Sequence, residues 1–294
     1  MTFSIVARDA GSGQLGVAVQ TAMFAAGAVV PWAQAGVGAV ATQAIAEPAY
    51  GPRCLDLMAD GESATAALES VKADDAMSPL RQVGVVGADG SAAAFTGDLC
   101  IDHCGHLIGD GWTVQANMMA SAEVWPAMAA AYEASRSSSL ARRLLEALHA
   151  AQEAGGDARG QMSAALIVVD GSRADDPWAG RLVDVRVDRH QRPLEELDRL
   201  VDAADAYDLF ARGVDALMAG DASSALEALD AGLALLPGEE NLMFPRTGAL
   251  LLAGRQIEGL AEARALLAAR PSWSIVLRSF AQKGLITLPA DLDI

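Results

Sequence analysis

The sequence predicts an α+β protein, in which a larger domain of antiparallel strands and helices over residues 1–200 precedes a small all-α domain over residues 205–294. Two observations carry this prediction. Several short runs in the first part alternate between apolar and polar residues with the two-residue period of strands. The last part instead repeats itself at an offset of 34 residues, which is the period of a helix-pair repeat.

The chain opens with two predicted pairs of strands. Residues 2–7 alternate between apolar and more polar side chains, and the alternation returns over 15–21 after a turn-forming segment, which predicts a β-hairpin. Two further apolar runs, 28–35 and 37–44, flank Gly36 and predict a second pair of strands. Four strands are therefore expected before the first helix.

The following elements mix helices and strands. Pro48 and Pro52 break the strand pattern, and the apolar spacing over 52–71 then suits one face of a helix. Because strands and helices do not alternate strictly, a layered antiparallel arrangement is favoured over a doubly wound parallel sheet. The other predicted strands are 82–86, 92–96, a segment near 107, 112–115, 163–169 and 182–187; two helices are predicted within 121–153, and another from Pro193.

The C-terminal segment is predicted to contain two tetratricopeptide-like repeats and a final helix. When the segment is aligned with itself, Gly220 falls on Gly254 at the tight turn, and Pro237 falls on Pro271 after the second helix. Repeat arrays present concave binding surfaces, so this tail is a candidate interface for a protein partner or for a second copy in a homodimer.

Composition excludes several classes of protein. The net charge of −17 would repel a phosphate backbone, so nucleic acid is not an expected partner. No run of residues has the length and apolarity of a membrane span, and no secretory signal is evident at the N-terminus. Three cysteines are too few for a disulfide framework. A cytoplasmic location is expected.

Thr2 is the candidate nucleophile. Its small side chain favours removal of Met1, which leaves a free α-amino group with a pKa of roughly 8. Such an amine can act as the base for the hydroxyl of its own residue, which is otherwise a weak nucleophile. The alternative is that Thr2 is simply a strand-favouring residue after the start codon.

A family resemblance favours the first alternative. The segments TFSIVARD, LGVAVQTAMFAAGAVVP, AGVGAVATQA and YGPRCLDLM, followed by RQVGVV, TGDLC, VQANMM and QMSAAL, resemble domain-of-unknown-function family 1028 over about residues 1–190. That family is placed in the N-terminal-nucleophile hydrolase superfamily. The resemblance implies a four-layer αββα sandwich and the cleavage of amide bonds by an N-terminal Thr, Ser or Cys.

The resemblance also implies roles for particular residues. Thr2 matches the nucleophile, and Gly109 and Gly111 resemble a glycine loop whose backbone N–H groups stabilise the oxyanion, a contribution often worth roughly 3 to 4 kcal/mol. Gln43 and Asn117 are further candidate donors, although each could instead be a polar strand end satisfied by backbone or water. Residues expected to line the substrate site are Ser4, Arg8, Gln20 and Thr21.

The sequence departs from the superfamily pattern in one respect. Proteasome-type members place a lysine close to the threonine, but the lysines of this chain are Lys72 and Lys283, neither at the corresponding strand. Arg8 and Arg186 cannot replace a lysine as base because a guanidinium stays protonated. Two hypotheses remain: an amidohydrolase whose α-amine works alone, or an inactive hydrolase fold that serves as a binding protein through its helical tail.

No metal or other cofactor is predicted. Cys100, His103, Cys104 and His106 are residue types that bind zinc. Structural zinc sites generally draw pairs of ligands from two separated segments, and no second pair accompanies this one.

Overall fold

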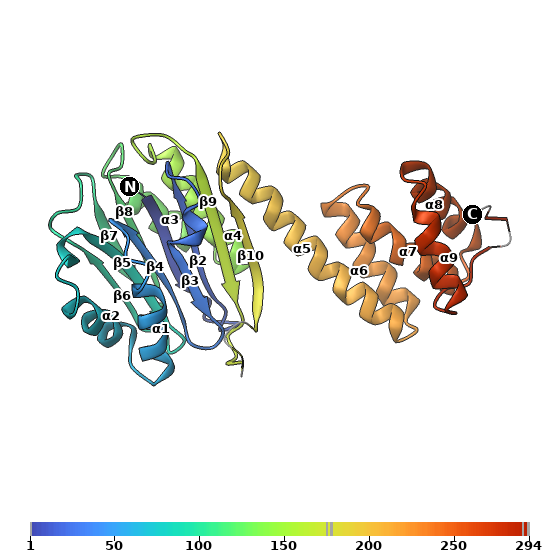
Figure 1. The fold of residues 1–294 in the computed structure, drawn as a ribbon, viewed down its shortest axis with the longest axis horizontal. Helices are drawn as coiled ribbons and strands as arrows, with labels where there is room; N and C mark the ends of the chain where they lie inside the picture. The colour runs from blue at the N-terminus through green and yellow to red at the C-terminus, as the bar shows by residue number, and fades with distance from the viewer. Residues whose placement is uncertain (1, 175, 177–178, 290, 293–294) are drawn as a thin grey trace. The chain divides into compact units, whose positions relative to one another are not determined.

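The computed structural model describes residues 2–174, 176, 179–289 and 291–292. The chain divides into two compact units, Met1–Val201 and Asp202–Ile294 (Figure 1). The first unit contains both sheets and the second is helical, so the predicted α+β class is confirmed. Within the described residues, no helix has the length and apolarity needed to cross a membrane.

Two antiparallel sheets form the first unit. The described strands make a six-stranded sheet in the order β10-β9-β2-β1-β8-β7 and a four-stranded sheet in the order β3-β4-β5-β6. The strands of the first sheet are β1 (Thr2–Arg8), β2 (Leu15–Thr21), β7 (Gly105–Gly109), β8 (Trp112–Asn117), β9 (Ser163–Val169) and β10 (Arg181–Val187). Those of the second are β3 (Pro31–Gln34), β4 (Gly38–Ala44), β5 (Arg81–Gly87) and β6 (Ala92–Thr96).

Helices cover one face of each sheet. The helices α3 (Val124–Ala134) and α4 (Leu140–Glu153) pack on the six-stranded sheet through a core that includes Phe3, Ile5 and Leu166. The helices α1 (Tyr50–Ala59) and α2 (Ala64–Ala73) pack on the four-stranded sheet. A third core between the two sheets contains Val6, Val17 and Ala41. Because side chains alternate along β1, the β1 residues of this core point away from the β1 residues that face α4.

Two predicted elements differ from the structure. The strand expected over 28–35 is limited to β3, because residues 26–28 form a 3-10 turn. The single helical stretch expected over 52–71 is two helices, since Gly61 ends α1 in a left-handed backbone conformation (φ +102°). The Ser63 hydroxyl then caps α2 by accepting a 3.2 Å hydrogen bond from the Ala66 amide.

The second unit is all-helical. Its helices are α5 (Pro193–Met218), whose first turns belong to the other unit, α6 (Ala222–Leu235), α7 (Glu240–Leu252), α8 (Gln256–Ala269) and α9 (Trp273–Gln282). Gly220 after α5 and Gly254 after α7, which the sequence alignment matched, both have left-handed backbones (φ +79° and +77°). The assignment of these helices to the tetratricopeptide class stays a prediction.

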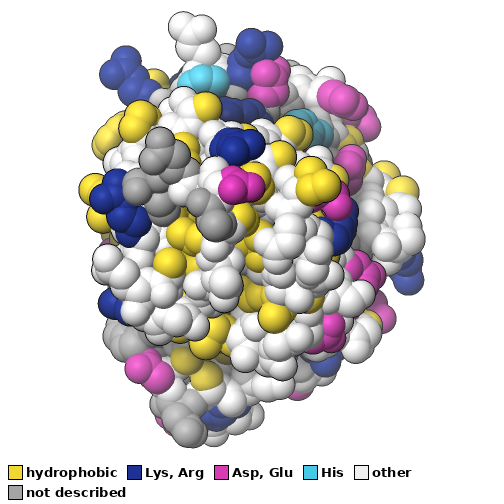
Figure 2. All heavy atoms as spheres, turned by 90° about the vertical axis from the view of Figure 1, so that its right-hand side faces the viewer, with side chains coloured by type: hydrophobic (Ala, Val, Ile, Leu, Met, Phe, Trp, Pro, Cys, Tyr) yellow, Lys and Arg dark blue, Asp and Glu magenta, His cyan; other side chains and the backbone are white. Residues whose placement is uncertain are grey.

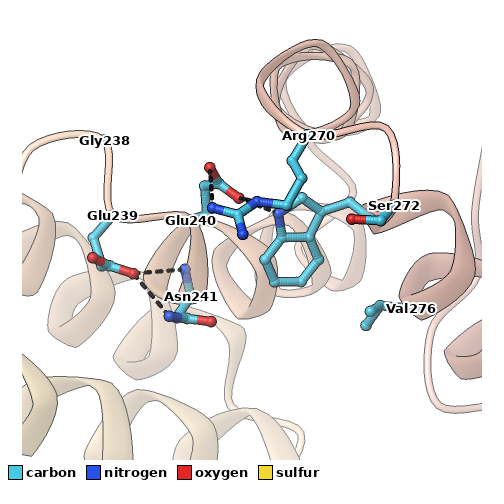
Figure 3. A pocket seen from close by; sticks show the side chains of 8 residues that line it. Gly238, Glu239, Glu240, Asn241, Arg270, Ser272 and Val276 are labelled. Carbon is cyan, nitrogen blue, oxygen red and sulfur yellow. Dashed lines mark hydrogen bonds and ion pairs between the residues drawn. The ribbon is translucent and has the colours of Figure 1, made fainter.

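A small polar pocket of about 340 Å³ lies where α7 meets the turn before α9. Its centre is the Glu240 carboxylate, which accepts hydrogen bonds from Trp273 Nε1 and, at 3.0 Å, from Arg270 Nε (Figure 3). These bonds lower the pKa of Glu240 below its usual range, with the bond from Trp273 as the largest cause. The residues of this pocket bond to one another, so it helps to join α7 to α9.

Candidate functional site

Thr2 lies at the start of β1, where both sheets end. It pairs with Asn117 at the end of β8, and its hydroxyl donates a 3.3 Å hydrogen bond to the Thr21 hydroxyl at the end of β2. Side chains alternate along a strand, so Thr2 and Ser4 face the second sheet while Phe3 faces the helices. The candidate nucleophile therefore lies at one end of the space between the sheets.

A cluster of polar side chains fills that space beside Thr2. We call it the amide cluster, and its members are buried. Gln43 Nε2 lies 3.1 Å from the Thr2 carbonyl and 2.7 Å from Gln82 Oε1, and the Ser4 hydroxyl donates to Gln43 Oε1 at 2.7 Å. The cluster comprises Ser4, Gln43, Gln82, Gln115 and Asn117.

Sequence analysis missed two members of the cluster: Gln115, whose Nε2 donates to the Ser4 hydroxyl at 2.7 Å, and Gln82. The Oε1 of Gln82 accepts from both Gln43 and Asn117, and its Nε2 lies within 3.2 Å of three acceptors, including Thr96 Oγ1 and the Ala116 carbonyl. The pairing of Gln43 with Gln82 across β4 and β5 was the available signal, because two glutamines at matching strand positions can share a hydrogen bond.

A second polar group, also missed, lies beyond Thr21. The Asp157 carboxylate is completely buried and accepts from the Ala22 amide at 3.0 Å and from Arg159 Nη2 at 2.9 Å. A buried carboxylate is costly unless it is paired, and Arg159 supplies the partner. Through its bond to the Ala22 amide, Asp157 holds the backbone that follows Thr21. Nothing in the spacing of Asp157 relative to Thr2 predicts the contact, since they lie at opposite ends of the first unit's sequence.

Thr21, Ser4, Gln43 and Asn117 thus lie beside Thr2, and their roles in catalysis or substrate binding stay predictions. The predicted glycine loop does not lie beside Thr2. Gly111 accepts a 2.8 Å hydrogen bond from the Arg8 amide, and Trp112 pairs with Ala7. The antiparallel register therefore puts Arg8, Gly109 and Gly111 at the far end of β1, about 20 Å from Thr2 at roughly 3.3 Å per residue. The prediction that these three residues share the site with Thr2 is wrong.

Gln20 is also separated from Thr2, although it is close in sequence to Thr21. It pairs with Phe3, and paired residues project from the same face of a sheet. Gln20 therefore points toward the helical layer that covers Phe3, and both of its buried side-chain amide atoms are without hydrogen-bond partners among the described residues.

The segment with the four zinc-type residues lies across the same end of the sandwich. His103 Nδ1 lies 3.0 Å from the Met119 carbonyl, and His106 Nδ1 lies 2.8 Å from Thr96 Oγ1. Burial raises the pKa of the Cys100 and Cys104 thiols, which disfavours the thiolate form that binds metals. No group of three or more metal-ligating side chains gathers within the described part of the chain.

The loops around Thr2 hold backbone strain. Left-handed backbone conformations are unfavourable for residues other than glycine, and those found in the described chain are Ala25 (φ +54°), Ala44 (φ +69°), His103 (φ +53°) and Met118 (φ +56°). Each lies within a few residues of a strand end at the Thr2 end of the sheets. Strain of this kind persists where the surrounding structure imposes it and is concentrated at functional sites.

The arrangement suits nucleophilic attack by a hydroxyl better than attack by a thiol. Cys54 is buried in the core of the four-stranded sheet, and burial raises its pKa to about 12. Lys72 binds Glu69 on the surface of α2 and so supplies no base to Thr2. The α-amino group that Thr2 would gain on removal of Met1 is then the base closest to the hydroxyl.

Comparisons with known proteins agree with the fold. A crystal structure of the protein SPO2555 from Silicibacter pomeroyi, described with the family model DUF1028, is 33% identical and matches with a TM-score of 0.62, over 69% of this chain and 85% of that one. No curated protein matches the chain. The model of the family of unknown function DUF1028 matches residues 2–197. This chain therefore belongs to the DUF1028 family.

Proposed function

We propose that this protein is an N-terminal-nucleophile amidohydrolase that cleaves a small amide or peptide bond. The observation that carries the proposal is the position of Thr2, the first residue of β1. Its hydroxyl lies 3.3 Å from Thr21 Oγ1, and its carbonyl accepts hydrogen bonds from the side-chain amides of Gln43 and Asn117. One core lies between helices and the six-stranded sheet, one lies between the two sheets, and one lies between the four-stranded sheet and helices. This order agrees with a four-layer αββα sandwich.

Removal of Met1, which lies outside the described residues, first exposes the α-amino group of Thr2. The Thr2 hydroxyl attacks the substrate carbonyl while the α-amino group accepts its proton, and a tetrahedral intermediate forms. The protonated amine then gives that proton to the leaving nitrogen as the C–N bond breaks. Water, activated by the same amine, hydrolyses the resulting ester and restores Thr2.

Asn117 is the candidate donor to the oxyanion. Its Nδ2 donates to Gln82 Oε1 at 2.8 Å, whereas its bond to the Thr2 carbonyl is long at 3.4 Å and readily exchanged for a stronger acceptor. Gln82 holds this amide group so that its nitrogen, and not its oxygen, faces Thr2. Removing one such donor typically lowers kcat by about 10²–10³.

The test combines intact mass with labelling. The wild-type protein is expected to lack Met1 and to gain the mass of a hydroxyl-reactive β-lactone on Thr2. Thr2→Ala should abolish labelling, and Thr2→Ser should retain it. A chain with Glu inserted between Met1 and Thr2 keeps the hydroxyl but has no free Thr2 amine; labelling of that protein, or retention of Met1 in labelled wild-type protein, would contradict the mechanism.

A second function, a binding protein on an inactive hydrolase fold, is supported by the second unit. A mainly apolar cavity of about 660 Å³ lies among its helices, and hydrophobic side chains gather in the middle of the face formed by its C-terminal helices (Figure 2). The lining includes Phe210, Leu217, Phe244, Leu251, Phe280 and Ile286. Absence of Thr2-dependent labelling, together with retention of a partner by this unit, would favour this function.

A further inference from the structure

Large apolar side chains surround the end of the sandwich that holds Thr2. We call them the apolar rim. They come from three loops: the one after β2, the one after β4 and the one between β6 and β7. Each is more than half exposed, and exposed apolar groups that gather in one region of a surface indicate a binding site. The rim comprises Met23 (55%), Phe24 (66%), Ile45 (57%), Leu99 (63%) and Ile101 (55%).

The rim is tied directly to the proposed nucleophile on the β2 side. The Met23 amide donates a 3.2 Å hydrogen bond to Thr21 Oγ1, the same atom that accepts from Thr2 Oγ1. On the β4 side, Ile45 stands two residues after Gln43, and its amide donates to the Leu80 carbonyl at 3.2 Å. The backbones of these rim residues are therefore held by hydrogen bonds next to the site.

The loop between β6 and β7 extends the rim from one sheet to the other. The Leu99 amide donates to the Pro79 carbonyl, just before β5, at 2.9 Å. Two residues later, Ile101 accepts from the Met118 amide, which follows Asn117 and β8, at 3.3 Å. Leu99 and Ile101 thus lie on a strap that crosses the end of the space between the sheets, beside Asn117.

Charge on the strap side of the rim disfavours anions. Asp98 and Asp102 flank the two apolar residues of the strap, and both are exposed. Beside the strap, Arg81 is committed to Asp75, whose pKa is lowered by its hydrogen bond from Arg81. Beside the loop after β2, Arg159 is committed to Asp157, and the exposed Arg186 and Arg189 also lie near that loop. A negative group that lies against the strap would therefore meet acidic side chains.

We infer that the amide substrate carries an uncharged apolar acyl group that the rim receives while its carbonyl faces Thr2. The inference rests on the proposed function, and it adds the substrate class. Burying each methylene of such a chain strengthens binding by up to about fourfold, so even partial burial gives a measurable preference for longer chains.

The experiment measures binding and turnover of three coumarin amides by the full chain. The acyl groups are acetyl, hexanoyl and adipoyl; adipoyl matches hexanoyl in length but ends in a carboxylate. Binding is measured on Thr2→Ala protein by fluorescence anisotropy, and turnover on the wild type. Hexanoyl should bind at least about tenfold more tightly than acetyl or adipoyl. Equal binding of the three overturns the inference, whether or not they are hydrolysed.

Substitutions locate the preference. Phe24→Ser and Leu99→Ser, each in the Thr2→Ala background, should reduce hexanoyl binding several-fold and leave acetyl binding unchanged. The matched control is Ile108→Ser, because Ile108 is similarly exposed (50%) but lies on β7 near the other end of β1. A chain-length preference without turnover supports the rim and contradicts the hydrolase. Rim variants that alter the sedimentation coefficient and not hexanoyl binding would show that the rim is a self-association surface and overturn the inference.

Discussion

At the scale of single residues, Gln82 determines how the polar groups between the sheets are arranged. It is completely buried, and both ends of its amide are bonded to groups from other strands. A glutamine amide donates through its nitrogen and accepts through its oxygen. One misplaced member of the amide cluster would therefore leave several buried groups without partners. Such a network is stable only when its members satisfy one another.

Replacing Gln82 with Leu should therefore destabilise the first unit. The change keeps much of the side-chain volume but leaves Asn117 Nδ2, Gln43 Nε2 and the Ala116 carbonyl short of a partner. We expect a loss of roughly 2 to 4 kcal/mol in the free energy of unfolding, measured by urea denaturation. The control is Gln191→Leu at an exposed position, for which the change should stay within about 0.5 kcal/mol.

A second residue-scale prediction concerns Gly36, in the turn between β3 and β4. Its backbone is left-handed (φ +64°), and an added Cβ would lie 2.2 Å from the Arg173 amide nitrogen. Gly90 has a similar backbone (φ +86°), but an added Cβ there would meet nothing within 4 Å. Both changes to Ala carry the left-handed penalty of roughly 1 to 2 kcal/mol, but only Gly36→Ala adds a close contact. Thermal unfolding should therefore show a larger decrease in stability for Gly36→Ala than for Gly90→Ala. Equal losses would contradict the close approach.

At the scale of elements, an ion pair joins the start of α5 to α4. His149 Nε2 on α4 lies 2.8 Å from Asp198 Oδ2 on α5, with each side chain about one-third exposed (34% and 36%). The hydrogen bond that His149 donates to the Asp198 carboxylate raises the pKa of His149 above its usual value, although burial opposes the shift. The bond thus stabilises the protonated form of the histidine.

This pair should make stability depend on pH. A raised pKa means that the stabilising contribution is fully present below the unfolded histidine pKa of about 6.5 and is lost as the pH rises through the folded value. His149→Gln should remove that dependence and cost up to about 1 kcal/mol at pH 6 but almost nothing at pH 8.5, because the pair is partly exposed. Urea unfolding at both pH values measures this, and Asp198→Asn should have the same effect; a pH-independent loss would contradict it.

Element boundaries also show what local sequence leaves open. The alternation over 15–21 predicted β2 correctly because both the hydrophobic pattern and the flanking turn residues agree. The strand predicted over 28–35 was too long, because an apolar run in a loop has the same composition as one in a strand. Gly61 was available as a helix stop, but apolar spacing continued across it and concealed the break.

At the scale of the whole molecule, the two units have separate cores. The described residues of the three larger core clusters lie at or before Val201, and those of the two smaller clusters lie after it. A hydrophobic core is the main source of cooperativity in a domain. Because each unit has its own core clusters, two unfolding transitions are expected.

Calorimetry should resolve these transitions. Leu166→Ala, in the core under α4, should lower only the transition of the first unit, and Leu250→Ala, in the α6 and α7 core, only that of the second. Both leucines are almost completely buried, so each change should cost about 2 to 5 kcal/mol. A single transition that both substitutions shift together would show that the units unfold as one.

The sequence by itself determined the fold class, most of the strands and the position of Thr2 at the start of β1, because periodicity and turn residues are local properties. It also indicated Ser4, Thr21, Gln43 and Asn117, which lie at or near strand ends. Only the tertiary structure separated the glycine loop from Thr2 and turned Gln20 away from it. Only the tertiary structure, too, brought Gln82, Gln115, Asp157 and the apolar rim to the site. Strand register and the packing of one sheet on another depend on residues far apart in the chain, and no local pattern encodes them.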